Sequence, residues 1–109
     1  MRARLVRGLL ITTLVLPALA ARSQTSDPRK ISYGRHLAQE CTACHRIDGT
    51  DNGIPSIVGQ DPAYFAETIG FYKTGARTNQ VMVSVAQSLD DGQVAALAAY
   101  YASLPKAKK

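Results

Sequence analysis

The chain has 109 residues, of which 46% are hydrophobic, and its formal net charge is +5. This length is sufficient for one small domain. Much of the positive charge lies at the ends, with Arg2, Arg4 and Arg7 at the start and three lysines after position 105. No helical segment combines clustered basic residues with interleaved aromatic residues, so we exclude nucleic acid and anionic lipid as partners.

The first 20 residues have the pattern of a secretory signal. A basic start at residues 1–7 is followed by an apolar run over residues 8–16 and by small residues ending at Ala20. We therefore predict a signal peptide over residues 1–20 and a periplasmic protein. A membrane anchor is the alternative, but the apolar run is much shorter than the roughly 20 residues that a spanning helix needs. We expect no membrane span after signal removal.

A short leader at residues 21–29 precedes the predicted domain, which covers residues 30–104 and ends in a basic tail at residues 105–109. Asp27 and Pro28 form a helix-start signal, as N-cap and first helical residue, for a helix that ends near Glu40. Its buried stripe follows from helical spacing and contains Ile31, Gly34, Leu37, Ala38 and Cys41.

Residues 46–59 are rich in Gly, Asp, Asn and Thr, which predicts a loop. A second start signal at Asp61 and a stop at Gly75 predict a helix over residues 63–74. A short third helix is expected over about residues 81–89. The apolar positions of the second helix are Tyr64, Phe65, Ile69 and Tyr72.

Asp90 and Gln93 have the spacing of a capping box, which predicts a last helix ending before Pro105. Its buried stripe contains Val94, Leu97, Ala98 and Tyr101. Since no segment alternates in the manner of a strand, the expected fold is all-α, with about four helices. Many stripe positions are Ala or Gly, so the helices fill little volume and a further group must complete the core.

Cys41-Thr-Ala-Cys44-His45 is the C-x-x-C-H pentapeptide of covalent haem attachment. Two thiols three residues apart can each form a thioether with one vinyl group of the porphyrin. The imidazole of His45 then lies over the iron. The motif predicts one haem c, with His45 as an iron ligand and a fold of helices wrapped around the cofactor.

Three other uses of these cysteines compete with haem. A structural zinc ion needs four ligands, and the adjacent Cys44 and His45 are poorly placed to share one tetrahedral ion. A redox-active dithiol of the thioredoxin kind needs a βαβ setting, which is not expected here. A plain disulfide suits an oxidising compartment, but it leaves His45 without a role.

The second iron ligand has two candidates after the signal, Met82 and His36. We predict Met82, because this residue begins a segment that can fold over the haem. A thioether ligand would raise the reduction potential. His36 lies on the same helix as Cys41 and cannot easily reach the far face. A core-filling methionine and an iron open to small ligands are the alternatives. Pro55, ten residues after His45, either offers a carbonyl to the imidazole or forms a rigid turn.

The pentapeptide, the loop Gly-Ile-Pro-Ser-Ile-Val-Gly-Gln60, one downstream Met and the end Ala-Leu-Ala-Ala-Tyr-Tyr-Ala-Ser-Leu104 resemble the class I c-type cytochromes. The chain is similar to small bacterial members, including the haem subunit of flavocytochrome c sulfide dehydrogenases. The resemblance implies thioethers at both cysteines, axial ligands His45 and Met82, and a Pro55 carbonyl on His45. It also implies that Gly34 lets the first helix approach Ala98 and Tyr101 of the last, and that Arg77 lies near the haem.

The resemblance implies electron transfer rather than catalysis, between a redox protein donor and an acceptor, with a flavoprotein subunit as one candidate partner. One alternative is a permanent cytochrome subunit of an oxidoreductase complex. Another is a haem-based ligand sensor with a labile Met82. Arg46 is a departure from the family, because many relatives have Gly at this position, beside the haem edge.

Overall fold

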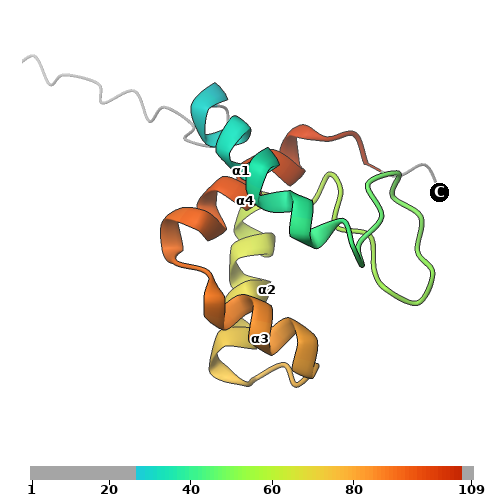
Figure 1. Cartoon of the computed structure of the whole chain (residues 1–109), viewed down its shortest axis with the longest axis vertical. Helices are drawn as coiled ribbons and strands as arrows, with labels where there is room; N and C mark the ends of the chain where they lie inside the picture. Colours follow the sequence, from blue (N-terminus) through green and yellow to red (C-terminus); the bar gives the residue numbers. More distant parts are fainter. Residues whose placement is uncertain (1–26, 107–109) are drawn as a thin grey trace, which may run out of the picture.

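The computed structural model describes residues 27–106, so the predicted signal peptide lies outside the described residues. Its helices are α1 (Pro28–Cys41), α2 (Pro62–Thr74), α3 (Gln80–Ser88) and α4 (Asp91–Ser103) (Figure 1). Residues 27–106 contain no strand. The all-α prediction is confirmed, and the helices begin and end close to their predicted bounds.

Short polar side chains fix where the helices begin. Asp27 and Asp61 each accept a hydrogen bond from a backbone N–H of the first turn, at 2.9 Å and 3.0 Å. At the start of α4, Asp90 and Gln93 bond reciprocally to each other's backbone N–H, at 2.7 Å and 2.9 Å. Gly75 ends α2 with φ of 79°, a conformation that glycine adopts without strain. These local contacts explain why the sequence predicts the helix bounds so closely.

Helices α1 and α4 cross at close range, and Gly34 lies at the crossing. A Cβ atom at Gly34 would be 2.0 Å from the carbonyl oxygen of Ala96 and 2.7 Å from Cβ of Tyr100. The predicted close approach is confirmed, but its expected partners, Ala98 and Tyr101, are wrong. The positions of α4 that meet Gly34 are Ala96 and Tyr100, while the Tyr101 ring stacks on Phe65 of α2.

Replacing Gly34 by alanine should lower the free energy of unfolding by about 1–3 kcal/mol, because the added methyl group overlaps backbone that cannot move aside. The matched control is Gly70→Ala on α2, where an added Cβ meets no atom within 4 Å. That change should instead stabilise the protein by about 0.5–1 kcal/mol. Urea unfolding of both haem-loaded variants measures the difference, and equal effects would contradict the close crossing.

The core is centred on α4 and is rich in alanine, as expected. Its largest fully buried side chains are Leu97 and Tyr101. The other buried apolar residues are Ala38, Val58, Phe65, Ile69, Ala86, Val94, Ala96, Ala98 and Ala99. Of the apolar positions of α2, Phe65 and Ile69 are buried, whereas Tyr64 is 50% exposed. A core with so few large side chains leaves room for another apolar component.

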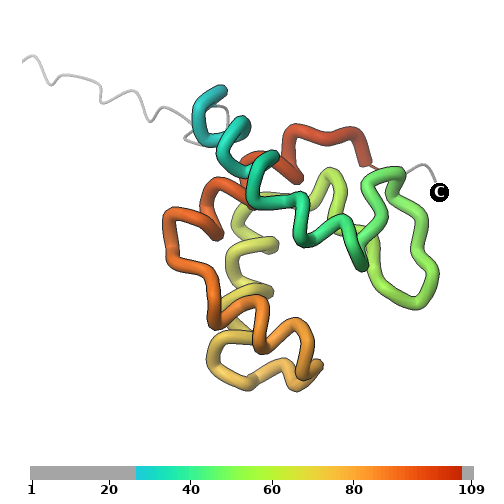
Figure 2. The backbone as a smooth tube through the Cα atoms, in the orientation of Figure 1, coloured from blue at the N-terminus to red at the C-terminus, as the bar shows by residue number. Residues whose placement is uncertain are grey.

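The long connection from α1 to α2 projects from the helices and returns beside the end of α4 (Figure 2). Its return is fixed by a hydrogen bond of 2.8 Å from the Gly59 N–H to the Tyr101 carbonyl oxygen. Gly59 has φ of 68°, and a Cβ there would be 2.8 Å from the backbone nitrogen of Lys106. The loop is therefore attached to the C-terminal end of the last helix.

Helix α3 is held against α2 by a polar contact at its end. The Lys73 Nζ atom donates a hydrogen bond to the Leu89 carbonyl oxygen and lies 4.0 Å from a carboxylate oxygen of Asp91. This contact joins α2 to the turn between α3 and α4. Within the described residues, none of the helices has the length and apolar character needed to cross a lipid bilayer.

Candidate haem site

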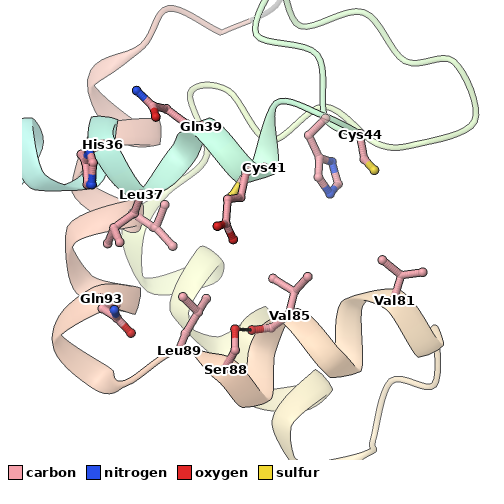
Figure 3. A pocket seen from close by; sticks show the side chains of 13 residues that line it. His36, Leu37, Gln39, Cys41, Cys44, Val81, Val85, Ser88, Leu89 and Gln93 are labelled. Atoms are coloured by element: carbon pink, nitrogen blue, oxygen red, sulfur yellow. Dashed lines mark hydrogen bonds between the residues drawn. The ribbon is translucent and has the colours of Figure 1, made fainter.

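A cavity of about 460 Å³ lies between the end of α1 and helix α3, with α4 behind it. The volume falls within the roughly 300–1,000 Å³ usual for cofactor sites. Figure 3 shows Cys41 and Cys44 on one side of the cavity and Val81 and Val85 of α3 on the other. The lining residues are His36, Leu37, Gln39, Glu40, Cys41, Cys44, His45, Val81, Val85, Ser88, Leu89, Gln93 and Leu97.

The pentapeptide reaches this cavity because α1 ends within it. Cys41 is the last residue of α1, and its carbonyl oxygen accepts hydrogen bonds from the N–H groups of Cys44, at 3.2 Å, and His45, at 2.8 Å. This turn brings both sulfur atoms and the imidazole to one wall. The thiols are free, with Cys41 half-buried and Cys44 exposed, so they do not form a disulfide. Burial raises the pKa of the Cys41 thiol.

The imidazole of His45 is oriented from the loop. Its Nδ1 atom lies 2.7 Å from the Pro55 carbonyl oxygen. A carbonyl oxygen can only accept, so Nδ1 carries the proton and donates it. The Nε2 atom of the neutral ring then keeps a free lone pair, which is what an iron ligand needs. The Pro55 carbonyl was among the expectations from the sequence, and the structure places it in contact with His45.

A local ion pair holds the loop between His45 and Pro55. Arg46 forms a two-point contact with the Asp48 carboxylate, and Asp48 also accepts a hydrogen bond from the Thr50 N–H at 2.9 Å. The Arg46 guanidinium holds the pKa of this carboxyl well below its usual range. Both side chains of the pair are about half exposed, so the contact shapes the loop more than it stabilises the fold.

Helix α3 presents an apolar wall to the pentapeptide. Val81 is 63% exposed and Val85 is 37% exposed, although both line the cavity, so their apolar surface is open to whatever occupies it. Met82 is half-buried and packs against the core, and it is not among the cavity-lining residues. Around α3, however, Met82 lies about 60° from Val85, which does line the cavity. Met82 is therefore at the border of this wall.

Of two further residues considered from the sequence, one lines the cavity and the other does not. His36 lines the cavity from α1, although its side chain is exposed. Arg77 does not line it, because its guanidinium lies 5.6 Å from the centre of the Tyr72 ring, outside the cavity. The sequence did not lead us to expect Val81 and Val85 in the cavity wall. Their spacing of four residues, about one helical turn, could have indicated that they share a face of the helix.

The chemistry of this wall fits haem c better than the competing groups. The residues combine two free thiols, an imidazole with a free Nε2 atom and an opposite apolar surface. In the described part of the chain, no three His, Cys, Asp or Glu side chains converge as a metal-ion site, which argues against structural zinc. Residues 27–106 contain no strand, so the βαβ unit that a thioredoxin-like dithiol needs is not found in this part of the chain.

No known family profile matches the chain, but individual proteins do. It is 39% identical over 75 residues to a thiosulfate dehydrogenase electron acceptor of Thiomonas intermedia strain K12, covering 66% of this chain and 35% of that protein. It is 37% identical over 92 residues to cytochrome c4 of Thiocapsa roseopersicina, covering 80% of this chain and 45% of the relative. The chain thus spans less than half the length of these two relatives.

A shorter relative is matched over most of its length. Cytochrome c-554(548) of Halomonas halodenitrificans is 37% identical over 68 residues, which cover 58% of this chain and 82% of that protein. The match agrees with the pentapeptide at the end of α1 and with the all-α fold around one cavity. The chain therefore belongs to the c-type cytochromes, and its cofactor is covalently bound haem c.

Proposed function

We propose that the protein is a periplasmic electron carrier in which haem c is attached through Cys41 and Cys44. The observation that supports this most directly is the convergence of both thiols and the oriented imidazole of His45 on one cavity wall. When bound, haem c supplies one-electron chemistry, since its iron cycles between Fe(II) and Fe(III). The chain's own residues bind the cofactor, orient the ligand and exclude water.

In this proposal His45 would be the first ligand of the haem iron. The Nδ1–H group donates a hydrogen bond to the Pro55 carbonyl oxygen. This leaves Nε2 as the ligating atom and strengthens it as an electron donor. Pro55 can do this because its loop returns to the end of α4 through Gly59. The ligand is therefore oriented by the fold and not only by the pentapeptide.

In this proposal Met82 would be the second ligand of the haem iron. It lies in the first turn of α3, where its N–H donates a hydrogen bond of 3.1 Å to the side-chain oxygen of the N-cap residue Asn79. Its side chain is unbranched and has three rotatable bonds, so it can turn from the core toward the adjoining cavity wall. The neutral thioether sulfur favours ferrous iron and raises the reduction potential.

The apolar wall of the cavity keeps water from the cofactor. Leu37, Leu89 and Leu97 line it together with the two valines of α3. A low local polarity disfavours the extra positive charge of the oxidised state, so burial also contributes to the potential. This role requires no general acid, base or nucleophile from the protein, in keeping with electron transfer instead of catalysis.

The partners in this proposal are a redox protein donor and a redox protein acceptor. Two relatives named as thiosulfate dehydrogenase electron acceptors, at 39% and 29% identity, support pairing with a dehydrogenase. The flavoprotein subunit expected from the sequence resemblance stays a prediction. Contacts between electron-transfer proteins are small and transient, which suits docking at an exposed edge of the cofactor.

The test is a visible spectrum, oxidised and reduced with dithionite, together with the denatured mass of protein matured by a periplasmic haem-attachment system. We expect sharp low-spin bands and a mass increase of one haem. The control replaces Cys41 and Cys44 by alanine, which should abolish haem that survives acidic acetone extraction. An unmodified mass without such bands in the unaltered protein would overturn the proposal.

A further inference from the structure

Tyr101 is held rigidly behind the pentapeptide. Its side chain is 1% exposed, and its ring stacks on Phe65 with centroids 5.7 Å apart and planes at 22°. The ring of Tyr100 closes another side, with centroids 5.2 Å apart. The backbone carbonyl of Tyr101 also accepts a hydrogen bond from the N–H of Gly59 in the loop between α1 and α2. The ring therefore has one position, and its hydroxyl points in one direction.

The Tyr101 hydroxyl is buried, and it has no hydrogen bond of good geometry to any group within residues 27–106. Its neighbour is the Cys41 thiol, which packs against the core cluster that contains Tyr101. Burial raises the pKa of Tyr101, and the adjacent Cys41 raises it further. In the opposite sense, the Tyr101 hydroxyl lowers the pKa of the Cys41 thiol, although the effect of burial is larger.

Cys41 lines the cavity and Tyr101 does not. Cys41, and not Tyr101, is therefore the residue of this pair that borders the space available to the cofactor. A buried hydroxyl without a partner is unfavourable, so its surroundings should complete the hydrogen bond when the cofactor is in place.

We propose that Tyr101 donates a hydrogen bond to the Cys41 sulfur once that sulfur is a thioether, and that this bond distinguishes the two attachment points. The inference rests on the proposed attachment through Cys41. A free thiol can donate or accept, but a thioether has lost its S–H and can only accept. The tyrosine must then be the donor, which its O–H allows.

The two thioethers are unequal under this proposal. Cys44 is exposed, whereas Cys41 is half-buried beside Tyr101. A donated hydrogen bond withdraws electron density from the Cys41 sulfur and so favours the reduced, electron-rich state of the attached group. Tyr101 is in this sense a positioning residue that acts on the cofactor through Cys41.

The experiment compares Tyr101→Phe with Tyr100→Phe in the haem-loaded protein. Both changes remove one hydroxyl from neighbouring tyrosines and keep the rings, but only Tyr101 adjoins Cys41. The readouts are the reduction potential and the shift of the carbon–sulfur stretching band in the resonance Raman spectrum on transfer to D₂O. We expect the unaltered protein and Tyr100→Phe to show the isotope shift. Tyr101→Phe should lose the shift and have a lower potential.

Retention of the isotope shift and of the potential in Tyr101→Phe would overturn the inference. The unaltered protein alone gives a second test, since the absence of any isotope shift in it would have the same meaning. If the unaltered protein carries no covalent haem, the proposed function fails instead. A haem-loaded protein without the isotope shift contradicts only the hydrogen bond, so the two failures are distinguishable.

Discussion

Replacing Met82 by alanine should leave the haem attached but lower its reduction potential by roughly 0.1–0.3 V, within the roughly 0.8 V range that axial ligands control. The thioether sulfur favours the ferrous state, and its loss leaves one side of the iron to water or an added ligand. The reduced variant should therefore bind carbon monoxide rapidly at neutral pH. Potentiometry and the visible spectrum measure both effects.

Val83→Ala is the matched control for Met82→Ala. Val83 follows Met82 on α3, is likewise partly buried and does not line the cavity. It should change stability without changing the potential or the binding of carbon monoxide. If the potential and spectrum of Met82→Ala equal those of the unaltered protein, Met82 is a core residue only. Rapid binding of carbon monoxide by the unaltered protein would favour the ligand-sensor alternative.

Replacing His45 by alanine should reduce the yield of haem-loaded protein by at least about tenfold. At metal sites, loss of a group that only supports a ligand already costs about tenfold or more in affinity, and here the ligand itself is lost. The variant loses both the Nε2 ligand and the contact with Pro55 that holds the loop. It also weakens retention of the cofactor on which this alanine-rich core depends. Haem absorbance per mole of protein, measured after export, gives the yield.

His36→Ala is the control for His45→Ala, since His36 lines the same cavity from an exposed position on α1. Its removal should leave the haem yield and the low-spin spectrum as they are. A similar loss in both variants would show that the effect comes from general damage to the cavity. A normal low-spin spectrum in His45→Ala would refute the assignment of His45 as ligand.

The sequence predicts the helices well because their bounds depend on local contacts. Asp27, Asp61 and the pair Asp90 and Gln93 each bond to backbone within their own first turn. The conformation of the pentapeptide is local in the same sense. Cys41 ends α1, and its carbonyl oxygen accepts hydrogen bonds from the N–H groups of Cys44 and His45. Patterns of this kind need no knowledge of the tertiary fold.

The errors concern contacts between distant elements. The partners of Gly34 were wrong, because the atoms nearest to it belong to Ala96 and Tyr100, while the ring of Tyr101 stacks on Phe65 of α2. Tyr64 was one of four apolar positions expected on α2, and the sequence did not show that only Phe65 and Ile69 among them are fully buried. Arg77 lies over the Tyr72 ring, and its expected place near the haem stays a prediction. Helical spacing indicates which residues share a face but not which neighbour that face meets.

The crossing of α1 and α4 also bears on how the domain folds and unfolds. Contacts such as that of Gly34 with Ala96 join opposite ends of the described chain, so they form only after a large loop has closed. Non-local contacts of this kind slow folding compared with a bundle of sequential helices. The two cavity walls are connected to the two crossing helices, since Cys41 ends α1, Cys44 lies in the turn after it, and α4 follows α3 in the chain. Separation of the two terminal helices would open the cavity at once, so we expect cofactor environment and helical structure to be lost in a single cooperative transition.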